Sequence, residues 1–297
     1  MKIVYVAKHH SGDNDDEGAI CYALEALGHE VVRFRENEGD RAIEEDGDFM
    51  LAHKWDDIAA MRRVKIPFVF WYFDLVFTED PGLISRTKSR GGWMREVEPL
   101  CTVGFCTDGD WIAHHKSEKL VHLFQGADER TAGLGVRLNG VPPIVFTGIA
   151  EHSIPRREHL AQLQERYGSD FRIIGSGGPR QRLHGRDLSN LLATAAVCVC
   201  PDSPVTELYW SNRVYLLTGL GGCVLHPYRN ILAKQYDPKT EVPMYNTREE
   251  LNELIDYFIA HPEERQAVRE AALARTMKEH LYRHRVMQLI ETVKERI

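Results

Sequence analysis

Residues 201–225, PDSPVTELYWSNRVYLLTGLGGCVL, combine a polar loop with the start of a helix. Ser211 suits the N-cap position, and the amides of Asn212, Arg213 and the next residue would then lack partners within the helix. These amides, the helix dipole and the charge of Arg213 would attract a phosphate group. Glu207 could accept hydrogen bonds from the hydroxyl groups of a sugar. The stretch predicts a pocket for a phosphorylated sugar, although an ordinary turn with a surface arginine explains it better when it is taken alone.

Asp74 directly follows the very apolar run PFVFWYF at 67–73. In a parallel sheet the carboxyl ends of the strands face the ligand, so a carboxylate there could orient a hydroxyl group or accept its proton. We therefore predict Asp74 as a catalytic residue of a cleft. A structural role, in which the carboxylate caps the following turn, is an equally good interpretation.

The loop after the first apolar run, KIVYVA at 2–7, contains His9, His10 and Gly12. The same argument about strand ends places this loop at the ligand-facing edge. We expect it to touch an acceptor or a phosphate group. The alternative is a pair of surface histidines without such a role.

A basic segment at 86–95 contains two adjacent glycines and a tryptophan, which predicts a loop. A solvated surface loop is its simplest interpretation, but Arg90 and Arg95 could also form the lip of a site for an anionic acceptor. The first 140 residues carry 17 Lys and Arg against 25 Asp and Glu. This excess of negative charge argues against a general nucleic-acid-binding surface, but it is compatible with a local groove that binds nucleic acid.

Composition and length describe a globular protein with room for two domains. The chain has 297 residues, of which 43% are hydrophobic and 27% charged. Its first ten residues lack a signal-peptide pattern, and its longest apolar runs are too short to cross a bilayer. We expect a cytoplasmic protein without membrane insertion. The six cysteines have no zinc-type spacing, so we expect buried thiols.

Strand-like and helix-like segments alternate along nearly the whole chain, which predicts mostly parallel, doubly wound sheets. Six strand-like runs precede residue 126, and a stretch rich in glycine and proline follows at 127–143. The alternation then restarts and ends in amphipathic helices from residue 248, interrupted near Pro262. We predict an α/β fold of two facing Rossmann-like domains, with boundaries at 1–138 and 139–280. The final helix, 281–297, would pack back on the first domain.

Three motifs of the second half resemble those of the two-domain GT-B glycosyltransferases. They are SNRVY at 211–215, GLGG at 219–222 and HLYRHR at 280–285, with GSGGP at 175–179 after a strand. The closest likeness is to family-4-like enzymes, also called glycosyl transferases group 1, and among them to the CgeB-like group. It covers most of 141–297, whereas over the first 140 residues it is architectural only.

The resemblance implies that the second domain binds a nucleotide-diphosphate sugar, with a UDP-sugar favoured. The diphosphate would bind at Ser211, Asn212 and Arg213, the same place that the residues alone suggest. Further donor-binding residues implied by the resemblance are Arg156, Arg157, Gly185, Arg186, Gly221 and Gly222.

Two departures from the family pattern limit what the resemblance implies. Family-4-like enzymes usually have two glutamates seven residues apart, the second of which holds the ribose. Here Leu216 stands where that second glutamate belongs, and Glu207 is one residue out of register with the first. In the first domain, Phe73 and Asp74 stand where many relatives have a histidine and an aspartate.

The activity implied is a glycosyltransferase that is retaining and metal-independent, with the nucleotide sugar as co-substrate and no cofactor. Asp108-Gly109-Asp110 resembles the metal-binding motif of the other glycosyltransferase fold, but that fold has one domain, so we expect no metal. The acceptor would be a hydroxyl group of a modified DNA base or of a glycan. Alternatives are an inactive nucleotide-sugar-binding protein of GT-B shape, suggested by Leu216 and Phe73, and a nucleotide-sugar epimerase.

Overall fold

The computed structural model describes the two halves of the chain as separate compact units. The described residues are 1–9, 15–53, 55–76, 84–133, 135, 143–150, 153–175, 183, 185–201 and 206–297, with backbone alone at 84–88 and 185. One unit is Met1–Gly126 with Tyr282–Ile297, and the other is Ala127–Leu281. No helix in the described part of the chain is both long and apolar enough to cross a membrane.

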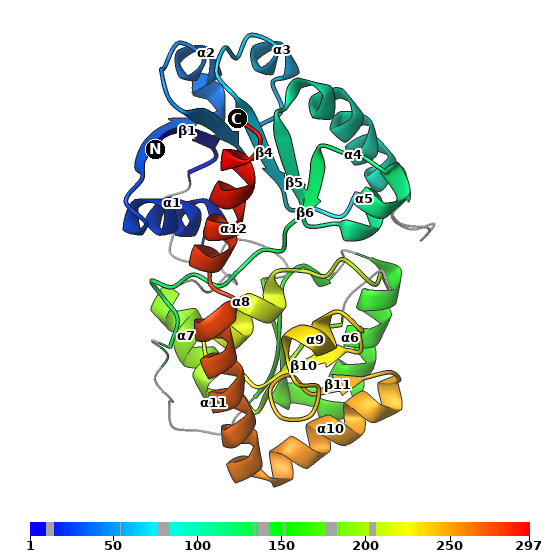
Figure 1. The fold of residues 1–297 in the computed structure, drawn as a ribbon. Coiled ribbons are helices and arrows are strands. Elements are labelled where there is room, and N and C mark those ends of the chain that lie inside the picture. The colour runs from blue at the N-terminus through cyan, green and yellow to red at the C-terminus, as the bar shows by residue number, and fades with distance from the viewer. Residues whose placement is uncertain are drawn as a thin grey trace. The chain divides into compact units, whose positions relative to one another are not determined.

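The first unit is built on a six-stranded parallel sheet in the order β2-β1-β3-β4-β5-β6 (Figure 1). Its strands are β1 (Lys2–Ala7), β2 (Glu30–Arg35), β3 (Phe49–Ala52), β4 (Phe68–Tyr72), β5 (Val103–Cys106) and β6 (Leu120–His122). Strands β1, β3, β4 and β5 are near-continuous apolar runs because both faces of the sheet are covered. The strand order reverses between β1 and β3, which creates a topological switch point at the carboxyl edge.

Six α-helices of the first unit flank this sheet in the part of the chain that the structure describes. They are α1 (Asp16–Ala26), α2 (Gly39–Ala42), α3 (Ile58–Met61), α4 (Ile84–Val97), α5 (Gly109–His115) and α12 (Tyr282–Lys294), and two 3-10 turns lie at Glu36–Glu38 and Glu98–Leu100.

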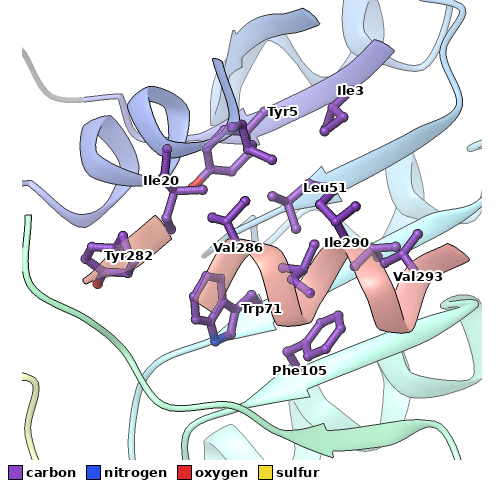
Figure 2. Close-up of a cluster of buried hydrophobic side chains, with 14 of the residues drawn as sticks. Ile3, Tyr5, Ile20, Leu51, Trp71, Phe105, Tyr282, Val286, Ile290 and Val293 are labelled. Carbon is purple, nitrogen blue, oxygen red and sulfur yellow. The ribbon is translucent and has the colours of Figure 1, made fainter. Parts of the chain in front are cut away.

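Helix α12 is the last element of the chain and completes the core of the first unit. Its buried residues recur at the spacing of one helical face: Tyr282, Val286, Leu289, Ile290 and Val293. They pack with residues of β1, β3, β4, β5 and α1 in one hydrophobic cluster. Figure 2 shows this helix against the side chains of the sheet. The first unit therefore needs the C-terminal residues for its core.

The second unit has a five-stranded sheet in the order β11-β10-β9-β7-β8. The strands are β7 (Ile144–Thr147), β8 (Phe171–Ile174), β9 (Val197–Val199), β10 (Val224–Pro227) and β11 (Met244–Tyr245), all parallel. The helices are α6 (Ile154–Tyr167), α7 (Gly185–Thr194), α8 (Arg213–Gly219), α9 (Leu232–Gln235), α10 (Arg248–Ala260) and α11 (Pro262–Glu279), with a 3-10 turn at Gly168–Asp170. When its strands are numbered from β7, they lie in the order 2-1-3-4-5, which is the order of the first five strands of the other sheet. The switch point of this second sheet lies between β7 and β9.

The predicted doubly wound parallel sheets are confirmed, but the basic segment at 86–95 is not the predicted loop. It lies within helix α4, and Gly91, Met94 and Val97 are buried at intervals of three residues. A Cβ at Gly91 would lie 3.5 Å from the ring of Trp111, so the glycine lets the helix pack closely against that ring. The paired glycines suggested a loop, whereas packing of this face stabilises the helix.

The expected interdomain stretch begins within the second unit. The Ala127 amide donates to the carbonyl oxygen of His280 at 2.8 Å, and the Gly133 amide donates to that of Gly219 at 2.8 Å. The six cysteines are all buried, as expected. Burial raises the pKa of the Cys101 and Cys198 thiols to about 12.

Candidate functional site

A pocket lies at the carboxyl edge of the second sheet, and two glycines form its floor. Gly148 follows β7 and Gly175 follows β8, with φ angles of +132° and +104°. A Cβ on Gly175 would come within 3.3 Å of the carbonyl oxygen of Gly148. The absence of a side chain at Gly175 thus lets the two turns pack backbone against backbone.

The walls of the pocket come from α8, α7 and the loops beside them. Ser211, Asn212, Arg213 and Leu216 form the α8 side. The remaining lining residues are Thr147, Ile149, Ile174, Leu183 and Leu188, which are mostly apolar. The cavity has a volume of about 260 Å³. Among the described residues that line it, none carries a carboxylate.

Arg213 supplies the positive charge of this pocket. Its side chain is buried, with the Nε–H group donating to the carbonyl oxygen of Thr147 at 2.6 Å. Its Cζ atom lies 4.9 Å from the centroid of the Phe146 ring. A Cβ on Gly148 would come within 2.9 Å of an Nη atom of Arg213. Glycine at 148 therefore leaves space for the guanidinium group at the end of β7.

The predicted N-cap at Ser211 is wrong by one residue. Helix α8 begins at Arg213, and its cap residue is Asn212, with φ −55° and ψ −9° and no hydrogen bond from its side chain to the helix start. The Arg213 amide donates to the Ser211 hydroxyl at 3.4 Å. Since α8 has seven residues, the electrostatics of the pocket depend on Arg213 and the glycine turns more than on the helix dipole.

The two predicted arginines of α6 have different environments. Arg156 is buried and donates to the carbonyl oxygens of Pro201 at 3.1 Å and Ile149 at 3.4 Å. Its Cζ atom lies 5.9 Å from the Phe146 ring, so Arg156 and Arg213 both contact that ring. Arg157 is exposed to solvent. Neither lines the pocket described above, and Arg156 supports the Ile149 loop beside it.

Four other predicted donor-binding residues lie outside the pocket lining. Gly185 and the exposed Arg186 begin α7, whose Leu188 does line the pocket. Gly221 and Gly222 are at the opposite end of α8 from Arg213. There Gly221 adopts φ +78°, and its carbonyl oxygen accepts a hydrogen bond from Arg269 at 2.8 Å. This glycine turn leads into β10 and does not line the pocket, so a donor contact there stays a prediction.

The exposed carboxylate of Glu207 lies near Asn230, whose side-chain amide donates to it at 3.4 Å. Leu216, which replaces the expected second glutamate, does line the pocket. The acidic residue that the family pattern calls for is thus replaced by an apolar one within the pocket itself.

In the first unit, Asp74 forms an ion pair with Arg90, with 3.3 Å between Oδ2 and an Nη atom. Arg90 also donates to the carbonyl oxygen of Leu75 at 2.9 Å. Two residues predicted for separate roles, catalysis and acceptor binding, are therefore brought together. Arg95 is exposed and lies over the ring of Trp111, with 5.2 Å from Cζ to the ring centroid.

His9 adopts a left-handed backbone conformation with φ +45°, which is unusual for a residue other than glycine. Its Nε2–H donates to the carbonyl oxygen of Tyr5 at 3.2 Å. Burial lowers the pKa of His9, so the imidazole is neutral at pH 7. The other predicted members of this loop, His10 and Gly12, lie outside the described residues.

A buried polar pair at the first switch point was not predicted. His53 follows β3, and its Nε2 atom lies 3.6 Å from Oε1 of Glu17 in the first turn of α1. The Nδ1–H of His53 donates to the carbonyl oxygen of Trp71 at 2.8 Å. The imidazole also packs on the Phe73 ring at a centroid distance of 3.9 Å. A signal was present, because a histidine ends the apolar run FMLAH, but its partner is far away in the sequence.

Asp108, whose motif resembles a metal-binding one, and His280 of the HLYRHR motif both have structural contacts. The Asp108 carboxylate caps α5 by accepting from the Trp111 amide at 3.0 Å, and it also accepts from the Val76 amide at 2.8 Å. The His280 ring packs against Tyr236 at 4.7 Å between centroids.

Several solved structures share this two-sheet architecture over nearly their whole length. HepE from Anabaena in complex with UDP-glucose has a TM-score of 0.62 at 12% identity, covering 99% of this chain and 100% of its own. A glycosyltransferase from Rickettsia africae gives 0.60 at 12%, covering 99% and 98%. An α1,3-fucosyltransferase gives 0.56 at 10%, covering 98% and 88%. The chain therefore has the GT-B fold, as the resemblance implied.

Residues 156–291 match the model of a family described as glycosyl transferase-like. This stretch contains Arg213 and Leu216 and ends within α12. No curated protein matches the chain. The solved structures confirm the predicted GT-B fold, and the matched stretch supports the prediction of a glycosyltransferase, while the CgeB-like subgroup stays a prediction.

Proposed function

We propose that the protein transfers a sugar from a nucleoside diphosphate sugar to a hydroxyl group, with the diphosphate bound in the pocket of the second unit. Arg213 carries this proposal. Its guanidinium group is buried at the pocket wall beside two glycine turns, in a lining without carboxylates among the described residues. Guanidinium groups bind phosphate oxygens through paired N–H donors.

In this mechanism, Arg213 stabilises the negative charge that develops on the leaving diphosphate as the glycosidic bond breaks. Arg156 holds the Ile149 loop beside the pocket through its two hydrogen bonds to carbonyl oxygens. Since Arg213 can offset the charge of the diphosphate, the transfer we propose is independent of a metal. We also retain the expectation of a retaining reaction, in which Asp74 orients the acceptor or the sugar. Arg90 would hold that carboxylate in position.

A glycan hydroxyl is the acceptor we favour over a hydroxylated DNA base. Arg90 pairs with Asp74, and Arg95 stacks on Trp111. The ion pair offsets the charge of Arg90, which weakens the case for a phosphate-binding lip. The decisive comparison is transfer to DNA by the wild type and by an Arg90→Ala/Arg95→Ala variant. Transfer that depends on both arginines would favour DNA.

Isothermal titration calorimetry with a panel of nucleoside diphosphates, including UDP, tests the donor site. We expect Arg213→Gln to lower affinity by about 30-fold or more, because truncating a buried charged donor costs about 2–5 kcal/mol. Arg157→Gln is the matched control, since Arg157 is exposed and outside the pocket. If no member of the panel binds, or if Arg213→Gln binds as the wild type does, the site assignment is wrong.

Hydrolysis or transfer of the bound donor tests catalysis separately from binding. Asp74→Asn should lower turnover while leaving nucleotide affinity unchanged, because Asp74 belongs to the other unit. Turnover at the wild-type rate would remove Asp74 from the mechanism. Tight nucleotide binding without turnover on any acceptor would support the inactive binding protein, an alternative motivated by Leu216 in the pocket.

A further inference from the structure

The α8 wall of the donor pocket changes from polar to apolar within one helical turn. Ser211, Asn212 and Arg213 are at its start, and Leu216 follows three residues later on the same face. The side chains that could bind an anion are thus grouped beside Thr147, whose carbonyl oxygen accepts the bond from Arg213. Beyond them the pocket has apolar walls.

The two ends of a nucleoside diphosphate sugar also differ in polarity. The transferred sugar is rich in hydroxyl groups, whereas a nucleobase has two flat faces of low polarity. Ile174, Leu183 and Leu188 line the pocket with aliphatic surface. Such surface suits the nucleobase, since burying hydroxyl groups against it would cost hydrogen bonds to water. With the diphosphate on Arg213, the nucleoside therefore occupies the apolar part.

The pentose is joined directly to the diphosphate, so with the diphosphate on Arg213 and the nucleobase on the apolar lining we place the pentose between them, beside α8. There the α8 wall presents Leu216, whose side chain can neither accept nor donate a hydrogen bond. A ribose 2′-hydroxyl placed there loses a hydrogen bond to water and gains none from this side chain. A 2′-deoxyribose has only hydrogen at that carbon and loses nothing.

We propose that this pocket selects a 2′-deoxyribonucleoside diphosphate sugar over the corresponding ribonucleoside donor. The inference depends on the donor site proposed above, and it deepens that proposal by naming the pentose. The apolar Leu216 discriminates against the 2′-hydroxyl group through desolvation, and a carboxylate at the same position would favour that group by accepting its hydrogen bond.

Calorimetry with UDP and dUDP tests the choice directly, because the two ligands differ only in the 2′-hydroxyl group. We expect the wild-type protein to bind dUDP at least about fivefold more tightly than UDP, as the loss of one hydrogen bond predicts. The preference is measured on the unaltered protein, so it does not depend on whether a variant folds.

Leu216→Glu should reverse the preference, and Leu216→Met, which keeps an apolar side chain, should preserve it. Thermal unfolding of each variant would confirm that it is folded. Equal affinities for UDP and dUDP in the wild type, or tighter binding of UDP, would overturn the pentose inference while leaving the donor site intact. Failure of both nucleotides to bind would overturn the donor site and the inference together.

Discussion

The two units have the same strand order, yet their switch points are built from opposite kinds of residue. At the second switch point, β7 is followed by Gly148, which with Arg213 lines a cavity of about 260 Å³. At the first, β3 is followed by His53, which is 1% exposed and packs on Phe73. Glu17, also buried, faces the imidazole. The second edge contains a pocket, whereas large side chains pack together in the described part of the first.

This difference shows that strand order creates a crevice in both sheets, while the side chains at the crevice determine whether it stays open. A reversal of strand order leaves a crevice at the carboxyl edge of any doubly wound sheet. Gly148 keeps that crevice open, because even one added carbon would approach Arg213 within 2.9 Å. In the first unit, α12 and the ring of Phe73 belong to one buried cluster with β1 and β3. We infer that the first switch point stabilises its unit and that the second binds a ligand.

The largest effect should come from Glu17→Ala in the first unit. Removing one member of a buried polar pair costs about 1–3 kcal/mol, so the unfolding transition of this unit should move to lower urea concentration. Tryptophan fluorescence reports on it, since Trp55, Trp71, Trp93 and Trp111 are in the first unit and only Trp210 is in the second. Nucleotide affinity should not change.

Glu25→Ala is the matched control on the same helix. Glu25 forms a solvent-exposed ion pair with Arg33, and such pairs contribute about 0–1 kcal/mol. If Glu17→Ala destabilised no more than Glu25→Ala, or abolished nucleotide binding in folded protein, the distinction between the two switch points would fail.

Acidification should lower the stability of the second unit, because His159 of α6 then becomes protonated. Burial, with the nearby charge of Arg248, lowers the pKa of His159 to about 4 from 6.5. Because the folded state binds fewer protons than the unfolded state between these values, the stabilisation is complete above pH 6.5 and is lost as the pH falls towards 4. We expect a loss of about 1–2 kcal/mol, allowing for partial solvent access.

Thermal unfolding at pH 7 and pH 5, for the wild type and His159→Gln, measures this contribution. The variant should lose less stability on acidification than the wild type. Equal acid sensitivity of both proteins would show that other groups determine the response.

Gly148→Ala should weaken binding of nucleoside diphosphates about tenfold, a cost of about 1.4 kcal/mol. The added methyl group would displace the guanidinium of Arg213, and φ +132° is unfavourable for alanine. Calorimetry with the UDP and dUDP pair measures the effect. Unchanged affinity would mean that the position of Arg213 does not control the site.

The smallest effect is expected from Gly92→Ala, which makes the same chemical change in the first unit. Gly92 lies within α4, and a Cβ there would have no atom within 4 Å. Alanine should stabilise the helix by about 0.5–1 kcal/mol without affecting nucleotide binding. Urea denaturation followed by tryptophan fluorescence measures it, and destabilisation would contradict the prediction.

Much of the fold could be predicted because local apolar patterns follow the strands and helices closely. The runs KIVYVA and PFVFWYF contain β1 and β4, and the pattern after residue 248 predicted the terminal helices. Helix α4 was missed since its paired glycines favour a loop locally, and its burial against Trp111 depends on residues distant in the sequence. Local propensity is a weak guide where tertiary packing opposes it.

The candidate site was predicted only in part, for a similar reason. Arg213 could be identified from its place at a helix start after a strand, and Leu216 from the family pattern. Gly148 and Gly175 were missed as a pair because only the pairing of β7 with β8 brings their turns together. Gly221 and Gly222 lie at the opposite end of α8 from Arg213, since a motif in a sequence does not reveal which end of a helix lies beside a pocket, and their donor-binding role stays a prediction.

The sequence by itself determined the two parallel sheets, the amphipathic helix that ends the chain and the placing of Arg213 at a helix start after a strand, because each depends on residues close together in the chain. Only the tertiary structure decided that Arg90 pairs with Asp74, that Glu17 faces His53 and that Leu216 belongs to the wall of a pocket floored by two glycines. These contacts join residues far apart in the sequence. Their distances are fixed by strand order and core packing, which no local pattern encodes.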